Sequence, residues 1–376
     1  MRFSSLPILR NSVIISAVNK SHFLKLVFLF CLIAFSLAPT ITVQAQSSAV
    51  PASSLAPSPK PPDVPSDWKG LVGIYGDIII LERNQQLFWR SSDGREKPIY
   101  PSKKDGYDFA VEGRVDFAPV TDSAGTVTAL TVVFRDSPLR RTDAGSDPSR
   151  FYRVQPLKPI EQLRATALGE QPPKETGPFR KPELVELVRM ESAFHLDIRY
   201  AQDNNFLSTR VYSQARAFMQ RPAAEALRRV LRKLEPLGYG LLIHDAYRPW
   251  YVTKIFWDAT PPEGKIFVAD PKKGSRHNRG CAVDLTLYDL TTSKPVEMPG
   301  LYDEMSPRSF PNFPGGTSLE RWHRDLLRRA MESEGFTVNE DEWWHFDYKD
   351  WKSYAILNVA FEELGVSSHR TTDQPW

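Results

Sequence analysis

The chain has 376 residues, 41% hydrophobic and 11% aromatic, with a formal net charge of +3 at pH 7. This length exceeds that of an ordinary single domain, so we expect two domains and terminal segments. The composition is that of an ordinary globular protein rather than a disordered one.

The first 45 residues have the features of a secretory signal. Their only charges apart from His22 are four basic residues, and an apolar run over residues 26–38 precedes a small-x-small tripeptide that ends at Ala45. We therefore predict a signal peptide over residues 1–45, cleaved after Ala45. The run is short for a transmembrane helix, and an uncleaved anchor is the alternative.

Cleavage changes both the charge and the cysteine content of the chain. It removes four basic and no acidic residues, which lowers the formal net charge from +3 to −1 and argues against a nucleic-acid binder. It also removes Cys31 and leaves Cys281 as the single thiol, so we expect no internal disulfide. These features predict an exported protein of the periplasm or cell envelope, stabilised by its core.

Three segments precede the part of the chain that carries the candidate chemistry. Residues 46–65 are rich in Pro, Ser and Ala and predict a disordered tether. Residues 66–156 contain short β-prone runs separated by Gly-containing turns, which predicts a small all-β antiparallel domain. Since it has no His/Cys/Asp cluster, we interpret it as a packing or spacer domain, with wall or partner binding as the alternative. Residues 157–181 are proline-rich and predict a linker.

Residues 182–376 alternate helical and strand patterns, which indicates an α+β domain. An amphipathic helix is predicted over residues 222–237, ending before Gly238, and is followed by a strand over residues 240–244. Pro249 can begin the next helix. A later helix is predicted from Thr317, which forms a capping box with Glu320, to Gly335.

Two stretches of this domain contain candidate metal ligands. In a strand over residues 280–287, alternation places Cys281 in the core and Asp284 on the opposite, open face, while His277 precedes Gly280 in a turn. Residues 343–346 are also strand-like and contain His345. On a regular strand Glu342 and His345 would point in opposite directions, so Glu342 must lie in a turn or bulge if the two are to meet.

These residue types suit a catalytic metal site. Two imidazoles and one carboxylate leave Zn²⁺ an open fourth position, and a carboxylate that is not a ligand can accept a proton from the bound water. We expect His277, Asp284 and His345 to converge on one zinc ion, with Glu342 beside them as the general base. Arg248 lies at a strand end, where it can stabilise an oxyanion or pair with an acid; His244 is interpreted as structural.

The motifs also carry a family resemblance. Together they resemble the zinc-dependent D-alanyl-D-alanine dipeptidases of the VanX type over residues 183–365, through Asp245-Ala-Tyr-Arg-Pro249, Ser275-x-His277-x-x-Gly280-x-Ala282-x-Asp284 and Glu342-Trp-Trp-His345.

The resemblance implies roles for individual residues and a fold. By it, one zinc is bound by His277, Asp284 and His345, Glu342 is the general base, and Arg248 stabilises the tetrahedral intermediate. Ser275, Tyr247 and Asp303 are expected to contact the substrate. The implied fold is the small α+β fold shared with D-Ala-D-Ala carboxypeptidases and the hedgehog signalling domain. The chain departs from the family pattern where Ser309-Phe310 replaces a Ser-His pair.

The function predicted is zinc-dependent hydrolysis of D-Ala-D-Ala, or of closely related short D-amino-acid peptides, in turnover or salvage of cell-wall fragments. One alternative is a D,D-carboxypeptidase acting on longer muropeptides. Another is a non-catalytic peptidoglycan-binding protein, against which the presence of Glu342 argues. No nucleic-acid partner is expected, and no membrane contact beyond an uncleaved anchor.

Overall fold

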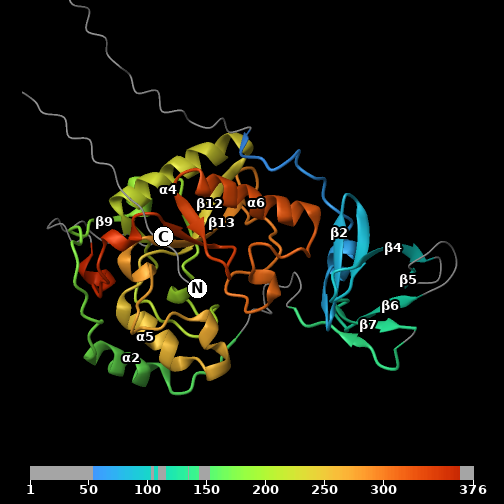
Figure 1. Cartoon of the computed structure of the whole chain (residues 1–376), viewed down its shortest axis with the longest axis horizontal. Helices are drawn as coiled ribbons and strands as arrows, with labels where there is room; N and C mark the ends of the chain where they lie inside the picture. Colours follow the sequence, from blue (N-terminus) through green and yellow to red (C-terminus); the bar gives the residue numbers. More distant parts are fainter. Residues whose placement is uncertain (1–53, 103–105, 109–115, 134, 144–152, 365–376) are drawn as a thin grey trace, which may run out of the picture. The chain divides into compact units, whose positions relative to one another are not determined.

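The computed structural model describes residues 54–364, except 103–105, 109–115, 134 and 144–152 (Figure 1). The predicted signal peptide lies outside these residues. Within them, no helix is long and apolar enough to cross a membrane.

The N-terminal part contains an antiparallel meander, which agrees with the all-β antiparallel arrangement predicted for it. A short helix, α1 (Ser66–Leu71), precedes eight strands that pair in sequence order. Their inward side chains, including Tyr75, Ile80, Leu87 and Phe117, form a separate hydrophobic core. The strands are β1 (Gly73–Tyr75), β2 (Ile78–Arg83), β3 (Gln86–Arg90), β4 (Glu96–Ser102), β5 (Gly106–Asp108), β6 (Phe117–Thr121), β7 (Val127–Val132) and β8 (Leu139–Arg140).

A buried glutamate connects this meander to a helix of the C-terminal part. Glu82 at the end of β2 is fully buried, and its carboxylate accepts hydrogen bonds from the backbone N–H groups of Gln85 and Ser318, each at 2.6 Å. Ser318 is the first residue of α6 (Ser318–Glu332). Because the first N–H groups of a helix lack intrahelical partners, Glu82 supplies a cap from outside the helix.

Two segments differ from the sequence prediction. Leu55 and Val64, in the predicted tether, are buried, and the Trp322 indole donates to the Ser58 carbonyl at 2.9 Å. The predicted linker contains a helix, α2 (Ile160–Gly169), whose apolar residues join the main core. Average composition misled the prediction in both places, because a few well-placed apolar side chains are enough to anchor a polar segment.

The C-terminal part is an α+β domain built on a five-stranded sheet with the order β10-β12-β13-β15-β14. β10 pairs with β12 in parallel, and the other neighbours are antiparallel. The strands are β10 (His195–Leu196), β12 (Tyr239–Asp245), β13 (Ala282–Asp289), β14 (Phe336–Val338) and β15 (His345–Tyr348). A two-stranded sheet joins β9 (Leu184–Glu186) to β11 (Phe218–Gln220), and α3 (Leu187–Met190) follows β9.

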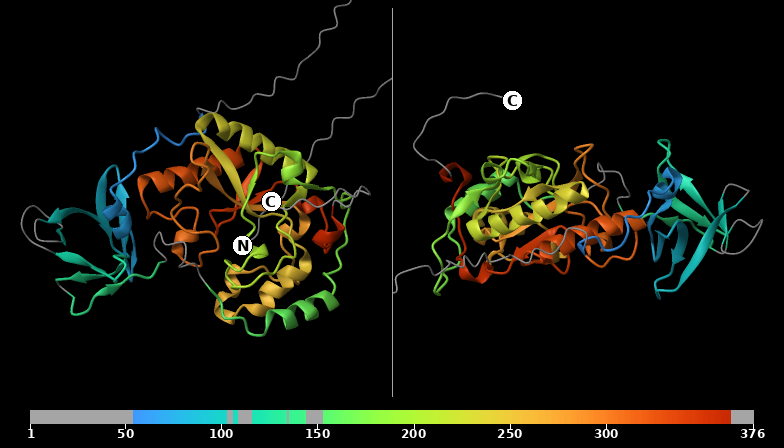
Figure 2. Two further views of the ribbon diagram at one scale, coloured as in Figure 1. Left: turned by 180° about the vertical axis from the view of Figure 1, so that it is seen from behind. Right: turned by 90° about the horizontal axis from the view of Figure 1, so that it is seen from above.

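Helices α4 (Arg221–Leu234) and α6 lie beside the larger sheet, while α5 (Trp250–Ala259) packs with α2 (Figures 1 and 2). Helices α4 and α6 begin and end close to the predicted positions, and α5 begins directly after Pro249 as predicted. α4 is followed by a 3₁₀ turn and then by Gly238 at φ 86°, and α6 begins with the Thr317–Glu320 capping box.

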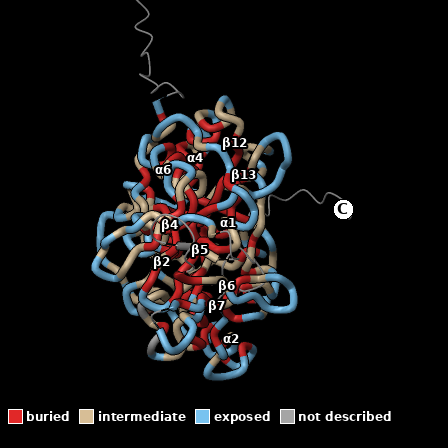
Figure 3. Tube along the Cα trace, turned by 90° about the vertical axis from the view of Figure 1, so that its right-hand side faces the viewer, coloured by how far each residue is buried: buried red, intermediate tan, exposed pale blue. Residues whose placement is uncertain are grey.

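The two central strands form the most deeply buried part of the sheet. β12 is buried throughout, and β13 is buried except at its last residue (Figure 3). Cys281, which directly precedes β13, is fully buried as predicted, and so are Val283 and Leu285 of β13; burial raises the pKa of the Cys281 thiol to about 12. The Asp284 side chain projects from the opposite face of β13, so it is held on a tightly packed strand that cannot easily move.

Candidate active site

Cross-strand pairing brings the first two candidate ligands together. Asp284 of β13 lies directly opposite His345, the first residue of β15. Directly paired residues on antiparallel strands project from the same face of the sheet. The strand begins at His345 rather than at Trp343 as predicted, because Trp343 and Trp344 form a turn before it.

His277 reaches the same place from a short 3₁₀ turn (His277–Arg279). Gly280, which ends this turn, has φ 67°, and a Cβ there would lie 2.5 Å from Leu184 Cδ2. The positive φ favours glycine here, and a larger residue would also displace the Leu184 side chain. His277 Nδ1 lies 2.6 Å from the Ala246 carbonyl, to which it can only donate, and this leaves Nε2 free as an acceptor.

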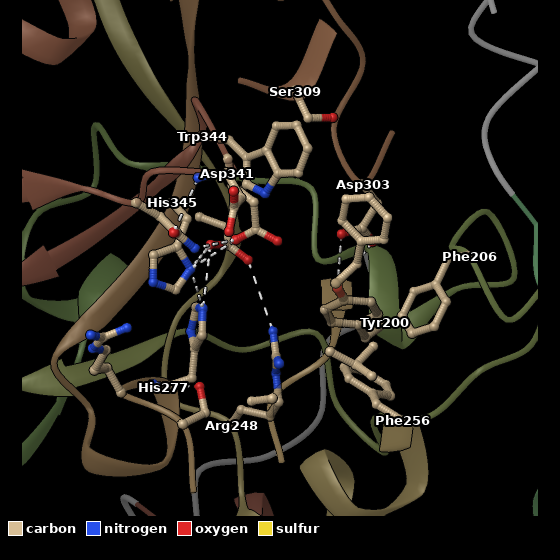
Figure 4. Close-up of a pocket in the computed structure, with 18 of the residues that line it drawn as sticks. Tyr200, Phe206, Arg248, Phe256, His277, Asp303, Ser309, Asp341, Trp344 and His345 are labelled. Carbon is tan, nitrogen blue, oxygen red and sulfur yellow. Dashed lines mark hydrogen bonds and ion pairs between the residues drawn. The ribbon is translucent and has the colours of Figure 1, made fainter. Parts of the chain in front are cut away.

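The three ligand atoms have the spacing of a metal site. His277 Nε2 and His345 Nδ1 lie 3.3 and 3.0 Å from Asp284 Oδ1, and 3.1 Å from each other. Tetrahedral bonds of about 2.0–2.1 Å place ligand atoms roughly 3.3 Å apart. Asp284 Oδ1 is buried without a hydrogen-bond partner, while Oδ2 accepts from the Tyr302 hydroxyl at 3.1 Å. The residues therefore fit a divalent metal, and the expected convergence is observed (Figure 4).

The electrostatics of the cluster favour a cation. Burial alone would raise the pKa of Asp284, but pairing with His277 and His345 holds it well below its usual range. Asp284 in turn raises the pKa of His345, although burial opposes this. In the absence of a metal ion, the buried Asp284 charge has to be balanced by protons on the neighbouring histidines. A metal ion can balance this charge instead, so Asp284 is a suitable metal ligand.

Glu342 lies before the turn, outside β15, as required for it to meet His345. Its Oε2 is 3.5 Å from His345 Nδ1 and accepts a hydrogen bond from the Asn339 side chain at 3.0 Å. Burial raises the pKa of Glu342, and the nearby Asp284 carboxylate raises it further. A carboxylate with a raised pKa beside a metal site is suited to accept and return a proton.

Arg248 is fixed between β12 and α5. Its Nε and Nη2 donate to Asp245 Oδ2 at 2.9 and 2.7 Å, and Nη2 lies 3.9 Å from Asp284 Oδ2. The other Asp245 oxygen accepts from the Tyr212 hydroxyl at 2.7 Å. Arg248 thus pairs with an acid, one of the two alternatives left open by the sequence, and it also lines the cavity beside the metal cluster. The role of Asp245 was missed, although it belongs to the recognised motif.

A cavity of about 520 Å³ opens onto the cluster. It is lined by Arg248, the three candidate ligands and Glu342, and by the aromatic residues Tyr200, Phe206, Phe256 and Trp344. Figure 4 shows Asp303 across the view from the two histidines, beside Tyr200. The cavity is therefore wide enough for a small peptide, with charged groups at both ends.

Asp303 is an unusual carboxylate within this cavity. Both of its oxygens accept from the Tyr200 hydroxyl, at 3.0 and 3.1 Å, and it forms no ion pair with any described residue. Its φ is 59°, a strained value for a side-chain-bearing residue. Burial, and then the charge of Asp284, raise its pKa to about 8. A carboxylate of this kind is suited to bind a cationic group of a ligand.

The other predicted contact residues divide between the cavity and the core. Ser275 lines the cavity, and its hydroxyl accepts from the His277 N–H at 3.2 Å. Tyr247, predicted to contact the substrate, instead lies fully buried outside the cavity lining, where its hydroxyl donates to the Val359 carbonyl. Tyr247 belongs to the same motif as Arg248, which lines the cavity. However, consecutive residues after a strand point in different directions, so the Tyr247 side chain enters the core instead. His244 is structural, stacked on Tyr302 at 4.5 Å.

Comparison with known proteins identifies the domain that carries this site. Residues 180–364 match the M15 peptidase family, described as D-ala-D-ala dipeptidase. The chain is 34% identical over 179 residues to the D-alanyl-D-alanine dipeptidase of Escherichia coli K12, covering 48% of this chain and 91% of that protein.

Two further relatives have the same name. The D-alanyl-D-alanine dipeptidase of Enterococcus faecalis V583 is 35% identical over 175 residues, which cover 41% of this chain and 85% of that protein. That of Streptomyces coelicolor is 33% identical over 177 residues, covering 42% and 88%. The similarity therefore extends over nearly the full length of each relative but less than half of this chain.

Proposed function

Because the chain belongs to the M15 peptidase family of D-Ala-D-Ala dipeptidases, we propose that it hydrolyses D-Ala-D-Ala with one zinc ion held by His277, Asp284 and His345. The observation that carries this proposal is the convergence of these three ligand atoms, 3.0–3.3 Å apart, beside Glu342 and Arg248. The finer fold assignment, to the group shared with hedgehog signalling domains, is part of the proposal.

The donor set favours zinc over hard cations. Two imidazole nitrogens and one carboxylate are typical of catalytic zinc, whereas Mg²⁺ and Ca²⁺ prefer oxygen ligands. A zinc ion held by these three residues would supply Lewis-acid chemistry and would make a water molecule more acidic.

Glu342 then acts as the proton carrier. Its Oε2 lies 3.5 Å from the His345 ligand atom and is not one of the three proposed ligands. It accepts the proton of the attacking water and delivers it to the leaving amino group. The Asn339 amide holds Oε2 in place, so the proton moves between groups that need no rearrangement.

Arg248 orients the scissile carbonyl and stabilises the negative charge that develops on it. Asp245 fixes the guanidinium through two hydrogen bonds, and Phe256 and Tyr200 lie over it at 4.8 and 5.3 Å. Since the Arg248 guanidinium is already held in position and its side chain is only 10% exposed, little reorganisation is needed in the transition state.

Asp303 is proposed to bind the free ammonium group of the dipeptide. A half-buried carboxylate without a cationic partner among the described residues can be stabilised by such a pair. This contact favours a free dipeptide over a longer muropeptide, whose corresponding nitrogen is an uncharged amide. Ser275, which also lines the cavity, is proposed to contact the substrate carboxylate or backbone.

Export from the cytoplasm is proposed on the features of residues 1–45, and it favours turnover or salvage of cell-wall fragments. An exported enzyme meets short peptides released from the wall, but not the cytoplasmic precursor pool. The domain divisions inferred from the sequence, with a β domain over residues 66–156, are part of this proposal.

The test compares two substrates of the zinc-loaded protein. We expect D-Ala-D-Ala to be cleaved with a kcat/KM at least roughly 100-fold above that of N-acetyl-D-Ala-D-Ala, because only the former carries the ammonium group. Equal or better cleavage of the acylated peptide would support a carboxypeptidase, and cleavage of neither would overturn the proposed function.

A further inference from the structure

His277 and His345 each direct one ring nitrogen toward the metal cluster, and the other ring nitrogen of each histidine has a different kind of hydrogen-bond partner. His277 uses Nδ1 to donate to a backbone carbonyl. His345 instead places Nε2 3.1 Å from Asp347 Oδ1. A backbone carbonyl is fixed by the fold, whereas a side-chain carboxylate needs support of its own.

The strand geometry explains how Asp347 reaches His345. The two residues are separated by one position on β15, so their side chains project from the same face. Asp347 pairs with Ala282 on β13, where the single methyl group leaves room for a carboxylate next to the imidazole. The Asp347 side chain is 13% exposed, and it does not line the cavity.

Arg276 supports this carboxylate from the other ligand segment. Its Nε lies 3.2 Å from Asp347 Oδ2, while its guanidinium lies 4.9 Å from the ring of Trp351. Arg276 directly precedes His277 in the chain. The pair formed by Arg276 and Asp347 therefore joins the segment of one histidine to the side chain that orients the other.

We propose that Asp347 is a positioning residue for the metal, and that Arg276 holds it in place; this inference rests on the proposed function. Rotation of the His345 ring by half a turn would move Nδ1 away from the metal position and remove Nε2 from Asp347. The hydrogen bond to Asp347 opposes that rotation, and the carboxylate charge makes His345 Nδ1 a stronger electron donor.

The test measures zinc affinity of the purified full chain by competition with a chromophoric chelator. We expect Asp347→Ala to weaken zinc binding roughly 10–100-fold, as loss of such outer partners does at other zinc sites. Asp347→Asn keeps an acceptor but loses the charge, so an intermediate loss is expected. Arg276→Gln, which leaves Asp347 unsupported, should weaken binding less than Asp347→Ala. The absorption spectrum of the cobalt(II)-substituted protein should change in the same order.

Asp350→Asn is the matched control. Asp350 is three residues further along the chain and pairs with Arg180 at 2.9 Å, away from the histidines. We expect its zinc affinity and cobalt spectrum to match those of the original protein. The melting temperature of each metal-free variant shows whether it is folded, and Asp347→Asn provides a second reading if Asp347→Ala is unstable.

The outcomes separate this inference from the proposed function. Wild-type protein that binds zinc and cleaves D-Ala-D-Ala, with Asp347→Ala and Asp347→Asn both within twofold of its zinc affinity, would overturn the positioning role alone. Wild-type protein that binds no zinc would overturn both. A graded loss in the order Ala, Asn, control supports the positioning role.

Discussion

Asp284 and His345 are direct cross-strand partners on β13 and β15, with 3.0 Å between Asp284 Oδ1 and His345 Nδ1. This relationship makes the sheet itself part of the candidate metal site. Only His277 comes from outside the two paired strands, and its turn is fixed by Gly280 and by the hydrogen bond to Ala246. Strand pairing and this turn thus fix the segments that carry the ligands, which lowers the cost of organising the site.

Glu342→Gln should remove the proton carrier while preserving the ligands. We expect kcat for D-Ala-D-Ala to fall roughly 10²–10⁴-fold, with zinc content and KM little changed. Steady-state kinetics and metal analysis measure the two quantities. Glu340→Gln, an exposed neighbour in the same loop, serves as the control and should retain full activity. If kcat of the Glu342→Gln protein equalled that of the original protein, another group would have to transfer the proton.

Arg248→Lys should show that the guanidinium geometry matters beyond its charge. Lysine cannot reproduce the paired hydrogen bonds to Asp245, so we expect kcat to fall roughly 10²–10³-fold. Kinetics at saturating D-Ala-D-Ala provide the measurement. Full activity in the lysine variant would reduce the role of Arg248 to a general positive charge.

Asp245→Ala should act on stability as well as activity. It would leave Arg248, whose side chain is 10% exposed, as a buried charge without its main partner. We expect a loss of about 3–5 kcal/mol in the free energy of unfolding. Chemical denaturation of the metal-free protein measures this loss. A change below about 1 kcal/mol would mean that water or Asp284 replaces the lost carboxylate.

Asp303→Asn should weaken binding of the dipeptide without affecting acylated peptides. A charged hydrogen bond of about 1.5–3 kcal/mol corresponds to a KM increase of roughly 10–100-fold for D-Ala-D-Ala. N-acetyl-D-Ala-D-Ala is the matched control, since it has no ammonium group to lose. An equal effect on both peptides would show that Asp303 supports the cavity rather than the ammonium group.

The raised pKa of Asp303 also predicts a dependence on pH. Since ionised Asp303 binds the ammonium group, KM for D-Ala-D-Ala should fall as the pH rises toward about 8, and Asp303→Asn should lose this dependence.

The same rise in pH should lower the stability of the folded protein. The folded pKa of about 8 exceeds the unfolded value of roughly 3.9, so the stabilising contribution is present below the unfolded value and is lost as the pH rises to about 8. Asp303→Asn should therefore melt at a higher temperature than the original protein at pH 8.

Strand alternation was enough to predict the burial of Cys281 and the placement of Asp284, because it depends only on neighbours in the sequence. The capping box at Thr317 and the left-handed Gly238 are local signals of the same kind, and both were confirmed. The turn before His345 was inferred because Glu342 has to approach His345. That inference rests on a chemical requirement rather than on a sequence pattern.

Contacts between distant segments were not predictable in the same way. Asp347 meets His345 and Arg276 only because β13 and β15 pair in one register, and no local pattern specifies that register. Tyr200 and Asp303 are about a hundred positions apart in the chain, yet they share a hydrogen bond in the cavity. Leu55 is buried although its neighbours have the composition of a tether, since burial depends on the surface that it meets.

The most direct test of the central claim is the rate of D-Ala-D-Ala hydrolysis as zinc is returned to chelator-treated protein. If His277, Asp284 and His345 hold one catalytic zinc, the metal-free protein should be inactive, and activity should rise linearly to full recovery at one equivalent of zinc. His277→Ala should show no such recovery at one equivalent. Unchanged hydrolysis by the metal-free protein, or by His277→Ala, would contradict the account.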